Sequence, residues 1–177
     1  MRIVSGLLKG RQLHSPVSLK VRPTTDKLRS AVFSILSDMQ EYPEILDAFA
    51  GTGALGIEAY SRGALHIDFI DKDISLLKTN TALMENGSYN IYKGDYLKIC
   101  TTLNRQYDLI IFDPPYNVYK TNEILASVSS NSILKDDGII LYEEFYKTEF
   151  INHDKFEIAD ERRYGDTIIR FLRYIKE

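Results

Sequence analysis

The stretch "EILDAFAGTGALGIEAYSR", residues 44 to 62, decides the fold. It begins as an apolar strand, "EILDAF", and ends as a helix, "ALGIEAYSR". Gly51, Gly53 and Gly56 between them satisfy the pattern G-x-G-x-x-G. A glycine loop between a strand and a helix is typical of a doubly wound sheet that binds a nucleotide-containing ligand.

The pattern after this stretch predicts a mostly parallel α/β sheet. Strands are expected over 44–49, 66–70, 90–94, 107–112 and 138–145, and helices over 54–62, 75–85, 96–103 and 119–128. Strands that alternate with helices imply parallel crossovers and a Rossmann-like, doubly wound fold. Residues 155–165 and 166–175 form two strand-like runs separated only by a Gly-Asp turn. They predict an antiparallel C-terminal hairpin and bring the expected sheet to seven strands.

The first 40 residues predict an extension that packs on a core domain of residues 41–177. "RIVSGLLKGRQL" indicates a small β-hairpin, and "RPTTDKLRSAVFSIL" indicates a helix with Thr24 or Thr25 as its N-cap. Residues 1–29 carry seven Lys or Arg against one acid, a net charge of +6, whereas the other 148 residues carry 15 basic and 24 acidic side chains. A basic arm on an acidic body suggests a polyanionic partner, and a solvated surface is the alternative.

Composition indicates a soluble globular protein. The chain has 177 residues, and no apolar run approaches the roughly 18 residues that a membrane span needs. Its N-terminus has no signal-peptide pattern. The single Cys100 excludes an internal disulfide and a cysteine-cluster metal site, and three scattered histidines suggest no metal ligands. We therefore expect a cytoplasmic protein without a membrane partner.

Carboxylates at strand ends favour S-adenosylmethionine over NAD as the ligand of the glycine loop. Asp47 precedes the loop, where it would repel the pyrophosphate of NAD but suit a cationic sulfonium ligand. Asp71 lies 18 residues after Gly53, at the end of the second strand, where an acid can bind a ribose diol. Asp95 follows the third strand and could accept a hydrogen bond from an adenine amino group or cap the next helix.

The sequence "DPPY", residues 113 to 116, ends the strand at 107–112 with a rigid turn. This strand should neighbour the first one, which ends near Phe49, so Asp113 should lie beside the bound ligand. The Asp113 carboxylate and the Pro114 carbonyl could then accept both hydrogens of a nucleobase amine and aim its lone pair at a methyl donor. Pro115 stiffens the turn, and Tyr116 could stack on the base. A purely structural turn is the alternative.

The motifs resemble those of the RsmD-type methyltransferases over nearly the whole chain. "RIVSG", "KGRQL", "VRPTTDKLR", "LDAFAGTGALGIEAYSRGA", "IDKD" and "DPPY" occur in that family's order. The resemblance implies a class I methyltransferase fold and methyl transfer from S-adenosylmethionine to guanine N2 in small-subunit (16S) ribosomal RNA. It further implies action as a monomer, within an assembling subunit.

The same resemblance assigns roles to individual residues. The catalytic loop would be Asp113, Pro114, Pro115 and Tyr116. The cofactor would be bound by Arg22, Thr24, Asp47, Phe49, Gly51, Gly53, Asp71 and Asp95. Lys9 and Arg11 would contact RNA. Two positions depart from the family pattern: Asp71 stands where glutamate is usual, and Glu143 is followed by Glu144 and Phe145 in place of Glu-x-Glu.

Three other functions stay open from the residues alone. An adenine N6-methyltransferase could use the same Asp-Pro-Pro-Tyr turn, because adenine also carries a planar exocyclic amine. An NAD-dependent oxidoreductase would share the glycine loop but would not need the turn at Asp113 or the basic arm. A non-catalytic RNA-binding protein would explain the arm but not Asp113.

Overall fold

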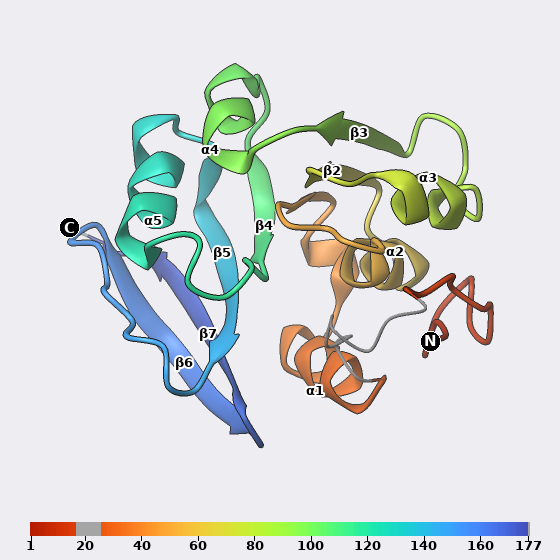
Figure 1. Cartoon of the computed structure of the whole chain (residues 1–177), viewed down its shortest axis with the longest axis horizontal. Coiled ribbons are helices and arrows are strands. Elements are labelled where there is room, and N and C mark those ends of the chain that lie inside the picture. Colours follow the sequence, from red (N-terminus) through yellow and green to blue (C-terminus); the bar gives the residue numbers. More distant parts are fainter. Residues whose placement is uncertain (17–25, 177) are drawn as a thin grey trace.

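The computed structural model describes residues 1–16 and 26–176, and a seven-stranded sheet forms its centre (Figure 1). The strands are β1 (Glu44–Asp47), β2 (His66–Asp71), β3 (Tyr89–Lys93), β4 (Tyr107–Phe112), β5 (Leu134–Phe145), β6 (Phe156–Tyr164) and β7 (Thr167–Tyr174). Their order is β3-β2-β1-β4-β5-β7-β6. The first five strands are parallel, and β7 is antiparallel to both β5 and β6. The predicted doubly wound sheet with its C-terminal hairpin is confirmed.

Helices cover both faces of the sheet. They are α1 (Asp26–Leu36), η1 (Met39–Glu41), α2 (Ala54–Ser61), α3 (Ser75–Thr81), α4 (Tyr96–Ile99), η2 (Cys100–Thr102) and α5 (Thr121–Ser130). Successive side chains of a strand point to opposite faces, so Ile45 and Ile111 pack with α1, α2 and α3, whereas Leu46 and Ile110 pack with α4 and α5. In the part of the chain that the structure describes, no helix is long and apolar enough to cross a membrane.

Strand order reverses at β1, which pairs with both β2 and β4. Asp47 is opposite Ile111 in this register, so the carboxyl ends of β1 and β4 lie side by side. The backbone continues this pairing beyond β1, because the N–H of Ala48 donates to the carbonyl of Ile111 at 3.0 Å. In an open α/β sheet, this switch point is where ligands bind.

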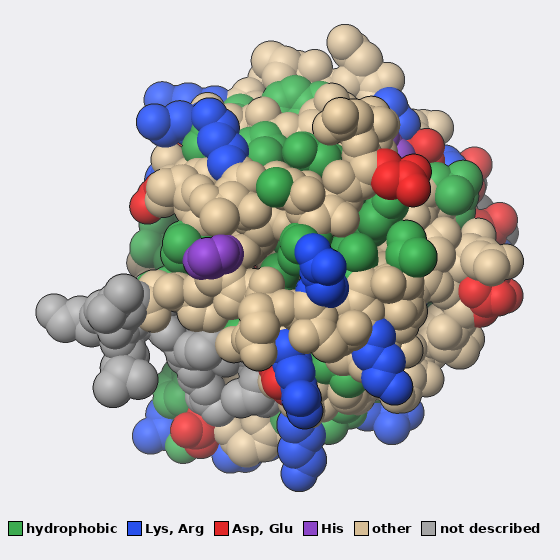
Figure 2. Space-filling model, turned by 90° about the vertical axis from the view of Figure 1, so that its right-hand side faces the viewer, with side chains coloured by type: hydrophobic (Ala, Val, Ile, Leu, Met, Phe, Trp, Pro, Cys, Tyr) green, Lys and Arg blue, Asp and Glu red, His purple; other side chains and the backbone are tan. Residues whose placement is uncertain are grey.

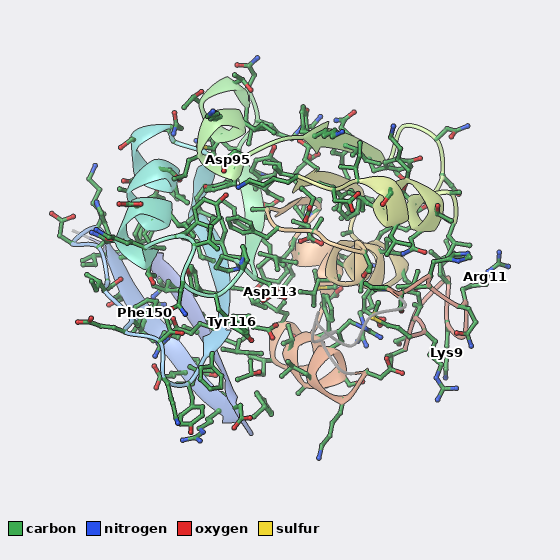
Figure 3. The ribbon with its side chains drawn as sticks, in the orientation of Figure 1. Lys9, Arg11, Asp95, Asp113, Tyr116 and Phe150 are labelled. Atoms are coloured by element: carbon green, nitrogen blue, oxygen red, sulfur yellow. The ribbon has the colours of Figure 1, made fainter. Side chains whose placement is uncertain are left out.

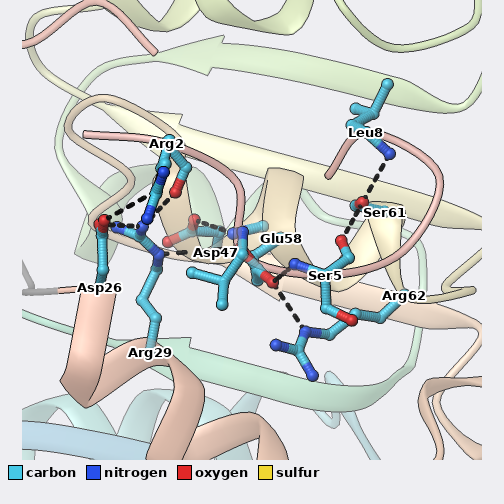
Figure 4. Close-up of polar contacts among 11 residues, drawn as sticks. Arg2, Ser5, Leu8, Asp26, Arg29, Asp47, Glu58, Ser61 and Arg62 are labelled. Atoms are coloured by element: carbon cyan, nitrogen blue, oxygen red, sulfur yellow. Dashed lines mark hydrogen bonds and ion pairs between the residues drawn. The ribbon is translucent and has the colours of Figure 1, made fainter. Parts of the chain in front are cut away.

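The N-terminal residues form the predicted hairpin in a short, irregular version. An isolated antiparallel bridge joins Arg2 and Gln12, and the N–H groups of Ile3 and Leu13 donate to the carbonyls of Arg11 and Met1, both at 3.0 Å. The N–H groups of Val4 and Ser5 donate to the carboxylate of Glu58 on α2, at 2.8 and 3.0 Å (Figure 4). Because the side chain of an adjacent helix satisfies these donors, the hairpin packs along the surface of α2 and is not free-standing.

Glu58 and Ser61 attach this N-terminal segment, residues 1–16, to the core. Glu58 is fully buried and also accepts from Nε of Arg62 at 2.8 Å. The Ser61 hydroxyl donates to the carbonyl of Ser5 and accepts from the N–H of Leu8 (Figure 4). The chain passes so close here that a Cβ on Gly6 would lie 1.7 Å from the carbonyl oxygen of Ser61.

Gly6 and Gly10 provide a matched test of this close approach. Both have positive φ, 80° and 83°, but a Cβ on Gly10 would meet nothing within 4 Å. We expect Gly10→Ala to lower the free energy of unfolding by about 1 kcal/mol, the cost of a left-handed backbone for alanine. Gly6→Ala should cost about 3 kcal/mol or more, because the new methyl group displaces the segment from α2. If urea titrations show that both variants lose the same free energy of unfolding, the segment is not held against α2 at Gly6.

Candidate functional site

A cavity of about 720 Å³ opens at the carboxyl ends of β1, β2 and β4. Its wall combines carboxylates, aromatic rings and the glycine loop. The carboxylates are Asp47, Asp71, Asp73 and Asp113, and the aromatic residues are Phe49, Tyr96, Tyr116 and Tyr119. Met1 and Pro16 also line it, so the N-terminal segment closes one side of the cavity.

Three side chains hold the glycine loop in place. Asp47 accepts from the N–H of Gly56 at 3.0 Å, and Asp71 accepts from the N–H of Gly51 at 2.7 Å. Asn80 on α3 donates to the carbonyl of Thr52 at 2.9 Å. Gly53 has a φ of 79°, so the turn into α2 requires a residue without a Cβ. The loop is therefore fixed at both ends by acids that also line the cavity.

The carboxylates of Asp47 and Asp113 have unusually high pKa values. The pKa of Asp47 is raised from 3.8 to about 7, mainly by burial; the hydrogen bond from Gly56 opposes this shift, and the nearby charges of Asp113 and Asp71 add to it. Burial likewise raises the pKa of Asp113 to about 7. Two such acids at one switch point make a site that gains stability when a cation binds.

Asp95 lies beside the cavity and fixes the position of Tyr119, which lines it. It caps α4 by accepting from the N–H of Leu97, which confirms the alternative role expected from the sequence. Its Oδ2 accepts from the Tyr119 hydroxyl at 2.5 Å and pairs with Nζ of Lys72 at 2.9 Å. These hydrogen bonds lower the pKa of Asp95. Asp95 thus contacts Tyr119, whose ring lies 5.1 Å from that of Phe49.

The catalytic loop predicted from the sequence begins where β4 ends. Asp113, Pro114, Pro115 and Tyr116 all line the cavity, together with the predicted Asp47, Phe49, Gly51 and Asp71. Pro114 is buried, whereas the Tyr116 side chain is 46% exposed. The loop thus presents a carboxylate and an aromatic ring to the same space.

Other predicted residues lie away from the cavity or outside the described residues. Lys9 and Arg11 are exposed on the N-terminal segment, at the end of the molecule far from Asp113 (Figure 3). Several Lys and Arg side chains stand out from this end (Figure 2). Arg22, Thr24 and the expected N-cap lie outside the described residues.

Sequence reasoning did not single out Tyr119, Lys72 or Asn80. Tyr119 follows the catalytic loop by three residues, and Lys72 follows Asp71 directly, so closeness to a predicted site residue was the available signal. Asn80 is 1% exposed on a short helix and also bonds both the N–H and the carbonyl of His14. A buried asparagine in "KTNTALME" gives no sequence signal for contacts with two distant loops.

Comparison with known proteins decides the family. The family model described as "Conserved hypothetical protein 95" matches residues 1–173. Ribosomal RNA small subunit methyltransferase D of Escherichia coli (strain K12) is 31% identical over 146 residues, which cover 81% of this chain and 74% of that protein. The chain belongs to the RsmD-type family.

Further relatives agree with this assignment. YlbH of Bacillus subtilis (strain 168) is 34% identical over 156 residues, 84% of this chain and 85% of that protein. The solved structure of yhhF from Escherichia coli superposes with a TM-score of 0.87 at 26% identity, covering 98% of this chain and 97% of that one. The RsmD-type chain therefore has the class I methyltransferase fold.

The cavity fits the cofactor of this methyltransferase family, S-adenosylmethionine. Its volume lies within the usual range for small-molecule sites, about 300–1,000 Å³. The acids Asp47, Asp71 and Asp113 suit a ligand with a sulfonium and an ammonium charge, whereas they would repel the pyrophosphate of NAD. Membership in the RsmD-type family decides against the oxidoreductase and against a non-catalytic RNA-binding protein.

The raised pKa of Asp47 predicts how stability depends on pH. The unfolded chain releases this proton near pH 4, whereas the folded RsmD-type protein keeps it until about pH 7. Stability of the free protein should therefore fall as pH rises from about 4 to about 7. Asp47→Asn should raise the free energy of unfolding at pH 8 by on the order of 2 kcal/mol, since the amide oxygen can still accept from Gly56.

Urea titrations at pH 5 and pH 8 would measure this effect. Asp136→Asn, which changes an exposed acid on β5, serves as the matched control and should have no such pH-dependent effect. A variant at Asp47 that is destabilised equally at both pH values would contradict the assignment of a protonated, buried carboxyl group.

Proposed function

We propose that this protein transfers a methyl group from S-adenosylmethionine to the N2 amine of a guanine in small-subunit ribosomal RNA. The observation that carries the proposal is the convergence of Asp113 and Pro114 on an acidic cavity that suits a sulfonium cofactor. The Escherichia coli relative is a ribosomal RNA small subunit methyltransferase D, which supports ribosomal RNA as the substrate. The resemblance of the motifs before the glycine loop supports guanine N2.

The chemical problem is the weak nucleophilicity of an aromatic amine. Its lone pair is delocalised into the ring, so the nitrogen must become tetrahedral before it attacks. Asp113 and the carbonyl of Pro114 are suited to accept the two amine hydrogens and so draw the lone pair out of the ring plane. The two prolines fix these acceptors in advance, which lowers the barrier without reorganisation of the loop.

Asp113 is also suited to accept the proton that the amine must lose in the reaction. S-adenosylmethionine supplies an electrophilic methyl group, whose bond to sulfur breaks as the bond to nitrogen forms. The nitrogen then holds one proton too many. A carboxylate whose pKa burial raises to about 7 is a suitable acceptor for that proton near neutral pH. Tyr116, exposed at the mouth of the cavity, is placed to stack on the base.

The aromatic wall is the proposed site of the adenine ring. Phe49 lies 5.4 Å from Tyr96 and 5.1 Å from Tyr119, measured between ring centroids. Asp95 then acts by holding Tyr119 against this wall. Asp71, which ends β2 at the cavity, is the proposed ribose ligand as well as the acceptor for Gly51.

Replacement of Asp113 tests the catalytic assignment. Asp113→Ala should lower kcat by about 10²–10³, because it removes an acceptor whose hydrogen bond strengthens in the transition state. Binding of S-adenosylhomocysteine should stay within a few-fold of the parent. Tyr116→Phe is the control on the same loop, and it should keep its activity because the ring remains. Near-normal turnover by Asp113→Ala would refute the mechanism.

Mapping of methylated nucleotides tests the substrate. Unmethylated small-subunit ribosomal RNA, incubated with the protein and S-adenosylmethionine, should gain N2-methylguanine at one position. Methylation at adenine N6 would replace the proposal with its main alternative, since Asp113 and Pro114 would treat either amine alike. Absence of methylation on free RNA and on isolated subunits would reject ribosomal RNA as the substrate.

The N-terminal segment is the proposed first RNA contact. Neutralising Lys9 and Arg11 together should weaken RNA binding and flatten its log–log salt dependence by about one to two units. Cofactor affinity should not change, because both side chains lie far from the cavity (Figure 3). The double variant Lys98→Gln and Lys155→Gln, which removes two exposed cations elsewhere, is the control. Parent-like binding across a salt titration would show that Lys9 and Arg11 are only solvated.

A further inference from the structure

We infer that the turn of the C-terminal hairpin is a second RNA-binding surface, which stacks nucleotides that flank the target base. The surface comprises Tyr116, Phe145, Tyr146 and Arg163, and we call it the aromatic track. The inference rests on the proposed function, because it assigns the recognition of the same RNA. It is carried by a continuous series of ring and guanidinium contacts that leads from the catalytic loop to the hairpin turn.

The contacts of the aromatic track follow one another without a gap. The Tyr116 ring lies 5.8 Å from that of Phe145, and the Phe145 ring lies 4.9 Å from that of Tyr146. The Arg163 guanidinium then covers the Tyr146 ring at 4.1 Å, and Nζ of Lys147 lies 5.5 Å from the same ring. Adjacent rings are inclined by 57° and 62°, so each planar group faces a different direction.

Sheet register places the track at the same edge as the active site. Phe112 at the end of β4 is opposite Tyr142 on β5, so the chain segments that carry Tyr116 and Phe145 leave the sheet at one edge. Phe145 is in turn opposite Thr167, the first residue of β7. The hairpin turn between β6 and β7 therefore lies directly beyond the carboxyl end of β5.

Backbone bonds hold the outer end of the track. The N–H of Tyr146 donates to the carbonyl of Asp166 at 2.9 Å, and Nε of Arg163 donates to the carbonyl of Gly165 at 2.8 Å. Tyr146 and Arg163 are thus fixed to the same turn before any ligand arrives. Such preorganisation lowers the entropy cost of binding a flexible strand.

The chemistry of the track fits single-stranded RNA. Unstacked bases bind to aromatic rings and arginine planes, whereas phosphates bind to nearby cations. Arg163 and Lys147 are exposed beside the partly exposed rings of Phe145 and Tyr146. Two neighbouring acids already pair within the hairpin, Asp160 with Arg162 and Glu161 with Arg170.

The track and the N-terminal segment would contact different parts of the substrate. Figure 3 places Lys9 and Arg11 at the right of the view, whereas the turn between β6 and β7 lies at its lower edge (Figure 1). RNA bound at Lys9 and Arg11 would therefore reach the cavity from the N-terminal segment. The aromatic track would hold the strand at a second place, beside the catalytic loop.

Two variants distinguish stacking from simple charge attraction. Tyr146→Leu keeps an apolar side chain but removes the ring, and Arg163→Lys keeps the charge but removes the planar group. Each should raise the Kd and KM for unmethylated small-subunit ribosomal RNA roughly tenfold. The kcat and the affinity for S-adenosylhomocysteine should stay within about twofold of the parent. Arg173→Lys, near the far end of the same hairpin and paired with Glu157, should match the parent throughout.

The outcomes separate this inference from the proposed function. RNA affinity is measured without turnover, so the variants test the track even if the modified nucleotide differs from the one proposed. Parent-like Kd and KM in both Tyr146→Leu and Arg163→Lys would overturn the inference while leaving methylation of ribosomal RNA intact. If RNA affinity falls tenfold in Tyr146→Leu but is unchanged in Arg163→Lys, then Arg163 does not contact the RNA. That result would overturn the inference that these four residues bind RNA together.

Discussion

Two carboxylates, the buried Asp47 and the partly buried Asp113, impose the constraint on which the rest of the structure depends. They lie at the carboxyl ends of adjacent strands, where the strand order of the sheet reverses, and burial raises the pKa of each to about 7. Such acids destabilise the free protein at neutral pH, because their charges are poorly solvated. A cationic ligand offsets this cost. The free protein is therefore less stable, but it binds the cationic cofactor more tightly.

Further polar contacts connect this site to the N-terminal segment, which is proposed to bind RNA. Asn80 bonds both His14 in the N-terminal segment and Thr52 in the glycine loop. Glu58 fixes Val4 and Ser5 to α2, the helix that the glycine loop starts. The predicted RNA contacts at Lys9 and Arg11 are therefore built on the helix that frames the cofactor cavity. Movement of the segment would be transmitted to the loop through one asparagine.

The sequence was sufficient for the fold and for the gathering of three acids at one sheet edge, and insufficient for contacts between distant side chains. Alternating strands and helices predicted the sheet, and strand ends placed Asp47, Asp71 and Asp113 at one edge. The strand β5 begins at Leu134, four residues before the predicted start. The prediction missed these residues because "LKDDG" has the composition of a turn. In the structure they extend the strand, and the pairing with β4 shifts register there. The N-terminal hairpin was predicted, but its attachment to the core was not, because Val4 donates to Glu58, which lies 54 residues further along the chain.

The role of Asp95 shows the same limit. Its position at a strand end suggested a ligand contact or a helix cap equally well. Only the structure shows that Tyr119 and Lys72 share one of its oxygens, since both come from other loops. A pattern in one stretch of sequence can specify the type of a side chain, but its partners depend on the packing of the whole sheet edge.

Proton release on ligand binding tests the central claim most directly. Calorimetry near pH 7, in buffers that differ in ionisation enthalpy, would compare S-adenosylmethionine with S-adenosylhomocysteine, which lacks the sulfonium charge. If the two acids are held partly protonated by burial, the sulfonium ligand should displace more protons than the neutral thioether, and Asp47→Asn should reduce the difference. Equal proton release by both ligands, unchanged in Asp47→Asn, would contradict the account.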